Sequence, residues 1–174
     1  MKRYEYLSLR RRYEPKSIKL VIIAESPPAS GKYFYNPEGC PSEPLFAALM
    51  KQLGYSPLTK EDGLLELRRT GWVLVDATYE PVNEPVNAPS SSGRNRIIAR
   101  DYPLLLEDLK SLIAGRPIPL VLIKANVCRI LEPKLAADGL NVLNRGRLIY
   151  FPATGRQKQF QQQFAEVLNS GGGS

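Results

Sequence analysis

Four short runs of aliphatic residues alternate with longer amphipathic segments along this chain of 174 residues. Aliphatic and β-branched runs without polar interruption are typical of strands buried on both faces, as in a parallel sheet covered by helices. The predicted strands cover residues 19–24, 72–77, 120–124 and 147–151. The pattern therefore predicts an α/β fold: a three-layer α/β/α sandwich with a central, mainly parallel four-stranded sheet.

The segments between these strands carry apolar residues at helical spacing. The predicted helices cover residues 43–53, 59–69, 102–113, 126–135 and 157–168. Ser42 is the expected N-cap of the first helix, with Pro44 in its first turn and Gly54 at its end. Thr59 is the expected N-cap of the second. Residues 78–96 are polar and rich in Pro, Asn and Ser, so they are predicted to form a long loop.

The composition divides the chain into three parts. Residues 1–16 form a basic N-terminal arm, residues 17–169 a single domain, and residues 170–174 a flexible Gly/Ser tail. The domain is long enough to bury one core.

Composition also limits the possible chemistry. The chain is 43% hydrophobic and has no apolar run that could span a bilayer, and its N-terminus lacks the apolar region of a secretory signal. Its two cysteines are too few for a disulfide framework or a four-ligand metal site. Histidine is absent, which excludes His-based acid–base catalysis and His-ligated metals. We expect a cytoplasmic protein with no membrane contact, no metal and no cofactor.

The net charge of +7 is unevenly distributed. Basic residues gather in the N-terminal arm, in the segment 94–100, and around the last predicted strand, where Arg145, Arg147, Arg156 and Lys158 lie. Basic groups beside loops that form a site suit a polyanion, with nucleic acid the leading candidate. The alternative is an ordinary solvated surface whose charge favours solubility.

A charged residue follows or ends each of three predicted strands. Pro27 and Pro28 end the first strand and leave Glu25 at its carboxyl end. The second strand delivers Asp76 and the third delivers Lys124. In open α/β sheets the ligand crevice lies outside the carboxyl ends of the strands, so these side chains are expected to line one pocket. Two alternatives are that Glu25 is solvated in a tight turn and that Asp76 and Lys124 form a structural ion pair.

The order of these parts resembles the uracil-DNA glycosylase superfamily. In that superfamily the first strand opens into a Gly-Glu-Ala-Pro-Gly-type motif, and here Ala24-Glu25-Ser26-Pro27-Pro28 stands in that place. A loop aromatic stacks on the extruded base, and Phe34 is the positional match. Asp76 occupies the position of an Asn that reads the base edge.

The similarity continues along the rest of the chain. Ser92-Gly-Arg-Asn-Arg96 is similar to an Arg-rich insertion in one branch of the superfamily. The segment Val121-Leu-Ile-Lys-Ala-Asn126 matches a Val-Leu-Leu-Gly-Ala-type strand and helix. Phe151-Pro-Ala-Thr154 stands in the place of a His-Pro-Ser motif that grips the minor groove.

Two departures change what the resemblance implies. An ionised Asp76 only accepts hydrogen bonds, so it would meet a uracil carbonyl unfavourably, and a base with an exocyclic amine suits it better. Phe151 removes the His that polarises the base carbonyl, and the four cysteines of iron–sulfur branches are missing.

The resemblance and the charge together predict a DNA-binding, base-flipping DNA glycosylase-like protein of the repair type. It would excise a modified base from single- or double-stranded DNA by N-glycosidic hydrolysis. The alternatives are a non-catalytic nucleic-acid-binding relative and an enzyme that acts on free nucleotides. The predicted catalytic residues are Glu25 and Lys124; the base-binding residues are Ser26, Phe34, Asp76 and Thr154; the DNA-backbone residues are Arg94, Arg96, Arg156 and Lys158.

These residues have distinct expected roles. Glu25 would hold or activate water, or stabilise the positive charge on the sugar. Phe34 would stack on the base. Lys124 or Thr154 would support the leaving base or a phosphate, and Lys124 could alternatively act as a Schiff-base nucleophile if it were buried.

Overall fold

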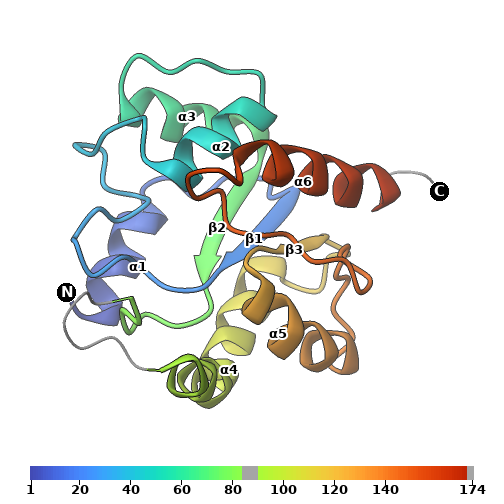
Figure 1. The fold of residues 1–174 in the computed structure, drawn as a ribbon. Helices are drawn as coiled ribbons and strands as arrows, with labels where there is room; N and C mark the ends of the chain where they lie inside the picture. The colour runs from blue at the N-terminus through green and yellow to red at the C-terminus, as the bar shows by residue number, and fades with distance from the viewer. Residues whose placement is uncertain (84–89, 172–174) are drawn as a thin grey trace.

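A parallel three-stranded sheet lies at the centre of the molecule. The computed structural model describes residues 1–83 and 90–171, and its sheet has the strand order β2-β1-β3 (Figure 1). The strands are β1 (Leu20–Ala24), β2 (Trp72–Asp76) and β3 (Leu120–Leu122). The prediction of a mixed α/β fold with a parallel sheet is confirmed, and each of these three strands ends within two residues of its predicted bounds.

Helices cover both faces of this sheet. Alternate residues of β1 point to opposite faces, so Ile22 enters one core cluster while Val21 and Ile23 enter the other. The helices that pack on the Ile22 face are α1 (Arg3–Arg11), α2 (Pro44–Gln52), α3 (Lys60–Thr70) and α6 (Gln157–Gly171). The opposite face is covered by α4 (Ser91–Ile113) and α5 (Ala125–Ala137).

The prediction of a fourth strand at residues 147–151 is wrong. Beside β3, Val142 forms only an isolated parallel bridge with Leu120. The Asn144 side chain then takes the place of a strand backbone: its Oδ1 accepts from the Leu122 amide at 2.8 Å, and its Nδ2 donates to the Leu122 carbonyl at 3.0 Å. A turn with two positive φ angles follows, so the chain leaves the sheet before it reaches the predicted strand.

The prediction of a loop over residues 78–96 is partly wrong, because helix α4 begins at Ser91. Ile98 anchors this early part of the helix, since its side chain is fully buried against the sheet. Pro103 lies inside the helix on its exposed side. Residues 84–89, the middle of the predicted loop, lie outside the described residues.

The predicted helix caps have mixed outcomes. Thr59 caps α3 as predicted, since its side chain accepts from the Asp62 amide at 3.1 Å. Ser42 is not the N-cap of α2: Glu43 occupies that position and Pro44 begins the helix. Proline is favoured there because its fixed φ suits the first turn and its missing N–H would have no helical partner.

Both ends of the chain contain helical residues. Residues 1–16, the basic segment at the N-terminus, include α1, whose Tyr6 and Arg10 are buried. Of the predicted Gly/Ser tail, Ser170 and Gly171 end α6, and residues 172–174 lie outside the described residues. Among the described helices, none is both long enough and apolar enough to cross a membrane.

Candidate functional site

A cavity of about 810 Å³ opens at the carboxyl edge of the sheet. Glu25 directly follows the central strand, and the register pairs its neighbour Ala24 with Asp76. Lys124 follows β3 on the other side of β1. The cavity brings together Glu25, Asp76, Lys124 and Phe34. Parallel strands place all their carboxyl ends at one edge, which explains why residues far apart in sequence meet here.

Both oxygens of the buried Glu25 carboxylate are fixed by hydrogen bonds. Lys124 Nζ donates to Oε1 at 2.6 Å, and Asn126 Nδ2 donates to Oε2 at 2.6 Å. The alternative that Glu25 is solvated is therefore wrong, and so is the alternative of an ion pair between Lys124 and Asp76. Asn126 was not among the predicted site residues, although its place just after the third strand could have indicated it.

Lys124 has a strained backbone. Its φ of 82° and ψ of 132° lie in a region that glycine adopts most easily, and such strain is common at functional sites. The Lys124 amide donates to the Ile149 carbonyl at 2.8 Å, which ties the start of α5 to the neighbouring extended segment. Its side chain is 32% exposed, so it lacks the burial that a Schiff-base role requires.

Asp76 is 4% exposed and lines the cavity. Burial raises the pKa of Asp76 to about 7, while the positive charge of Arg10 opposes this shift and the negative charge of Glu25 adds to it. The expectation that Asp76 is an ionised, acceptor-only group is therefore corrected. Near neutral pH both its protonated and its ionised forms are populated, so it can donate or accept.

Aromatic side chains form one wall of the cavity. Tyr33 and Phe34 both line it, and Tyr33 is only 2% exposed. Phe34 is also part of the core, since its ring packs edge-on against Phe46 at 5.4 Å between centroids. Phe34 therefore combines a place in the cavity wall with a packing role that the sequence did not indicate.

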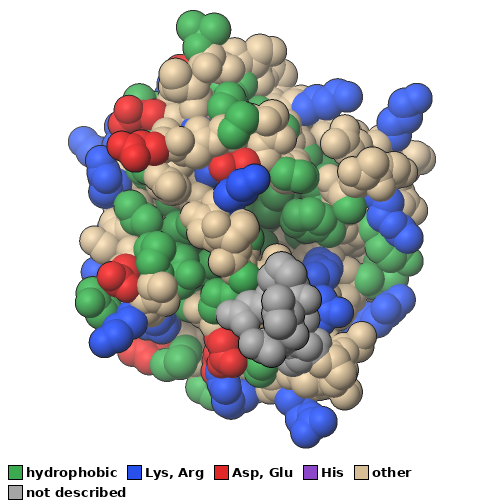
Figure 2. Space-filling model, turned by 60° about the vertical axis from the view of Figure 1, so that its left-hand side comes forward, with side chains coloured by type: hydrophobic (Ala, Val, Ile, Leu, Met, Phe, Trp, Pro, Cys, Tyr) green, Lys and Arg blue, Asp and Glu red, His purple; other side chains and the backbone are tan. Residues whose placement is uncertain are grey.

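The open side of the cavity is basic. Its lining includes Ser26 and, among the predicted backbone contacts, Arg94 and Arg156. It also includes Arg129, which was not predicted, and Tyr150, whose ring lies 4.6 Å below the Arg156 guanidinium. Figure 2 shows a face on which hydrophobic side chains lie beside Lys and Arg side chains.

Three predicted site residues stand apart from the cavity. Thr154, Arg96 and Lys158 are exposed and are not part of its lining. Arg96 and Lys158 can therefore contact only a partner that extends beyond the cavity mouth.

Arg10, which the sequence groups with a basic arm suited to a polyanion, is instead buried at 2% exposure. Its guanidinium donates two hydrogen bonds of 2.7 Å to Asp108 and one of 3.0 Å to Tyr79. It also pairs with Glu14 at 2.9 Å. Arg10 thus joins α1 to α4 beside Asp76 and is not available to a nucleic acid.

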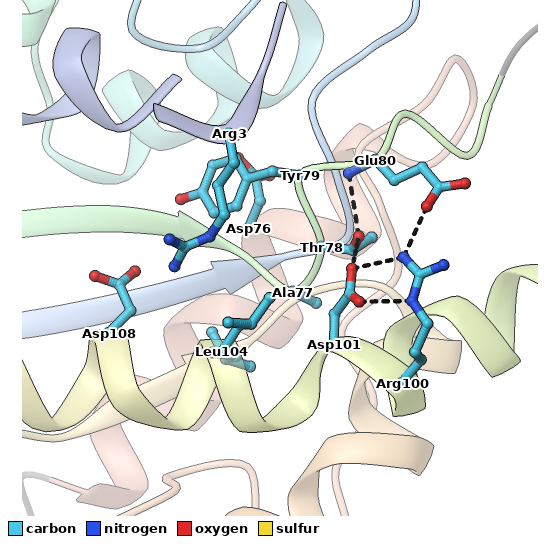
Figure 3. Close-up of a pocket in the computed structure, with 11 residues that line it drawn as sticks. Arg3, Asp76, Ala77, Thr78, Tyr79, Glu80, Arg100, Asp101, Leu104 and Asp108 are labelled. Carbon is cyan, nitrogen blue, oxygen red and sulfur yellow. Dashed lines mark hydrogen bonds and ion pairs between the residues drawn. The ribbon is translucent and has the colours of Figure 1, made fainter. Parts of the chain in front are cut away.

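A second, smaller cavity of about 270 Å³ lies on the α4 side of Asp76, which lines both cavities (Figure 3). Its polar groups are largely paired with each other. Thr78 Oγ1 donates to Asp101 at 2.6 Å, and Arg100 pairs with both Asp101 and Glu80 (Figure 3). Residues 76–80 are therefore held firmly against α4 at the end of β2.

The described residues contain no group of three or more His, Cys, Asp or Glu side chains placed to hold a metal ion. The sequence matches no protein-family model, and no curated protein matches it significantly. The fold and the site together define an α/β protein with a cavity at the carboxyl edge of a parallel sheet.

Proposed function

We propose that this chain is a base-flipping, DNA glycosylase-like protein with a three-layer α/β/α fold of the uracil-DNA glycosylase type. The observation that carries the proposal is the lining of the large cavity, which combines the buried carboxyl groups of Glu25 and Asp76 with the more exposed Arg94, Arg129 and Arg156. Arginines at the mouth suit phosphates, and buried polar groups suit a base turned out of its stack. A volume of about 810 Å³ is within the usual range for ligand cavities.

The backbone at Lys124 supports the resemblance on which the proposal draws. Lys124 stands where the similar motif has glycine, and its φ of 82° is a conformation that favours glycine. Lysine is strained in this conformation, but its side chain donates a hydrogen bond to Glu25 at 2.6 Å. The strain is of the order of 1–3 kcal/mol.

The proposed chemistry is hydrolysis of the N-glycosidic bond. A water oxygen bonds to C1′ of the sugar as the bond from C1′ to the base nitrogen breaks. The base leaves with that electron pair and takes up a proton, while the water loses one. Glu25 orients the water and opposes the positive charge that develops on the sugar, and Lys124 and Asn126 hold Glu25 in place.

Excision assays on a panel of modified and mismatched bases test this proposal. Single- and double-stranded oligonucleotides, each with one such base, are incubated with the full chain, and alkali then cleaves the strand wherever a base was removed. We expect excision of at least one base. Glu25→Gln should slow it by about 100-fold or more with little change in DNA affinity, because its charge acts on the transition state. Glu107→Gln, an exposed change outside the cavity, is the matched control.

The other outcomes point to the alternative functions. DNA binding without excision of any base in the panel would indicate a non-catalytic binding protein. Tighter binding of mononucleotides than of oligonucleotides would indicate an enzyme of free nucleotides.

A further inference from the structure

Three buried polar atoms lack a hydrogen-bond partner in the described part of the chain, and all three belong to residues that line the large cavity. They are Tyr33 Oη, Asp76 Oδ2 and Asn126 Oδ1. Buried polar atoms are almost always paired, because leaving one unpaired costs about 1–3 kcal/mol. Such atoms at one cavity, and at no other described place, indicate that what fills the cavity, water or a bound ligand, supplies their partners.

The hydrogen-bonding character of these atoms limits what the ligand can be. Asn126 Nδ2 already donates to Glu25 at 2.6 Å, so the free Oδ1 can only accept. Asp76 Oδ2 accepts when the carboxyl group is ionised, and the Tyr33 hydroxyl can either donate or accept. Among these three atoms, acceptors therefore outnumber donors when Asp76 is ionised.

Charge around the cavity further favours a ligand that donates hydrogen bonds. The Asp76 charge contributes, after burial itself, to raising the pKa of Tyr33, so the two groups are electrostatic neighbours. A donor on the ligand that bonds to Asp76 would favour the ionised carboxylate and relieve part of the burial cost. A carbonyl oxygen at the same place would face Asn126 Oδ1, an acceptor, and could bond to Asp76 only when that carboxyl group is protonated.

We propose that the cavity selects a nucleobase that carries an exocyclic amine, an aminopurine or aminopyrimidine, over the keto counterpart. This inference rests on the proposed function in that it takes a nucleobase to be what the cavity holds. The amine supplies N–H groups to Asp76 Oδ2 and Asn126 Oδ1, and the adjacent ring nitrogen accepts from the Tyr33 hydroxyl. In the keto counterpart the amine becomes a carbonyl and the ring nitrogen becomes a donor, so the pattern is reversed.

Binding measurements on matched base pairs test this selection. The probes are single-stranded oligonucleotides, abasic except at one 2′-fluoro nucleotide, a substitution that slows cleavage so that binding can be measured. The bases compared are cytosine with uracil and adenine with hypoxanthine, which differ only by the exchange of amine and carbonyl. We expect the amine base to bind about tenfold or more tightly in each pair. The corresponding nucleoside monophosphates form a second arm.

Each outcome separates this inference from the proposed function. Equal binding, or a preference for keto bases, overturns the inference and leaves oligonucleotide binding intact. An amine preference with tighter binding of monophosphates upholds the inference and overturns the proposed function. Absence of binding to every probe overturns both.

Two variants link the preference to the named atoms. Asp76→Asn, which gives an amide that both donates and accepts, should reduce the amine preference to about equal binding. Tyr33→Phe removes an atom that has no partner, so the fold is retained while affinity for the amine bases falls several-fold. The matched controls are Asp138→Asn and Tyr102→Phe, which change a hydrogen-bonded pair outside the cavity and should keep the preference. An unchanged preference in both cavity variants overturns the inference.

Discussion

The carboxyl group of Asp76 is titratable and has little access to water. It is 4% exposed, and burial raises its pKa to about 7. The groups that act on it come from several elements: Arg10 lowers its pKa, Glu25 raises it, and the buried phenol of Tyr33 lies close enough for its own pKa to respond. A protein keeps such a carboxyl group at a cost to stability, which suits a binding role better than a structural one.

The free-energy cost of ionising the buried Asp76 carboxyl group should appear as a pH dependence of stability. In the folded chain Asp76 keeps its proton up to about pH 7, whereas in the unfolded chain it loses it near pH 4. The folded state therefore binds more protons in this window, and the contribution of Asp76 to stability falls as the pH rises from about 4 to about 7. Asp76→Asn removes this fall, so its free energy of unfolding should exceed that of the wild type by a few kcal/mol at pH 8 and be similar near pH 4. The difference follows from the pKa shift, since each pKa unit corresponds to about 1.4 kcal/mol.

Urea unfolding at pH 4.5, 6 and 8 measures this difference. Asp138→Asn, an exposed change outside the cavity, is the matched control. A constant difference for Asp76→Asn would mean that Asp76 is ionised throughout the range.

At the scale of elements, one side chain closes the edge of the sheet. Asn144 is fully buried, and its amide bonds to both backbone groups of Leu122 and to the Arg147 carbonyl. It thereby provides hydrogen-bond partners for the N–H and carbonyl of Leu122 on the side where the sequence predicts a fourth strand. The aliphatic pattern of residues 147–151 indicates burial, and Ile149 is indeed buried, but pattern alone does not distinguish a strand from a buried extended segment.

Replacement of Asn144 should therefore destabilise this edge. Asn144→Ala leaves the Leu122 N–H and carbonyl unpaired in the interior, and we expect the free energy of unfolding to fall by about 2–4 kcal/mol. Urea unfolding measures this decrease, and hydrogen exchange at the Leu122 amide should become faster. Asn141→Ala, a nearby exposed change, should have little effect. A small decrease for Asn144→Ala would show that the segment re-forms these bonds with its own backbone.

A buried lysine ties helix α3 to the loop that carries the aromatic wall. Lys60 Nζ donates to the Tyr33 carbonyl at 2.8 Å and pairs with Glu43, and its side chain is fully buried. Burial lowers the pKa of Lys60, while Glu43 opposes this shift. A Cβ at Gly39 would lie 2.9 Å from Lys60 Nζ, so a larger residue there would displace the ends of these side chains.

Removing only one partner of this pair should be costly. Lys60→Met leaves Glu43 and the Tyr33 carbonyl without their donor, and we expect the free energy of unfolding in urea to fall by about 3–5 kcal/mol. The double variant Lys60→Met/Glu43→Gln should be less destabilised than Lys60→Met alone. Equal destabilisation would show that the two side chains are not energetically coupled. Lys51→Met on the surface of α2 is the control.

At the scale of the whole molecule, some of the 24 Lys and Arg side chains are paired with carboxylates of the same chain. Arg10 is buried in a pair with Asp108, and Arg100 pairs with Glu80 and Asp101. Arg94, Arg129 and Arg156 line the cavity, where a polyanion bound at that site can reach them. Salt dependence should therefore depend on these arginines more than on the total charge.

Binding of an oligonucleotide should weaken steeply with added salt. The double variant Arg94→Ala/Arg96→Ala should flatten the slope of log affinity against log salt by about 0.7–0.9 for each phosphate that the variant no longer neutralises. Fluorescence anisotropy between low and high salt measures the slope. Lys51→Ala/Lys110→Ala removes the same charge outside the cavity and should keep the wild-type slope. Wild-type behaviour of the arginine variant, or no binding at low salt, would contradict the assignment.

Local pattern was sufficient for much of this architecture. Aliphatic runs predict three of the strands, and the prolines after Glu25 place that carboxylate at the end of the first. A parallel sheet brings its carboxyl ends to one edge, so the neighbourhood of Glu25, Asp76 and Lys124 follows from strand order and direction. These features depend on interactions between residues that are close in sequence, or on rules of sheet geometry that every such chain obeys.

Only the tertiary structure decided which of these groups pair and which remain unpaired. Lys124 bonds to Glu25, 99 positions away, and leaves the buried Asp76 with one oxygen that has no partner among residues 1–83 and 90–171. Asn126 joins that pair, and Arg10 turns inward to Asp108 on a helix 98 positions away. Burial and pairing of charges depend on the distances between elements after they pack. The burial that results from this packing raises the pKa of Asp76.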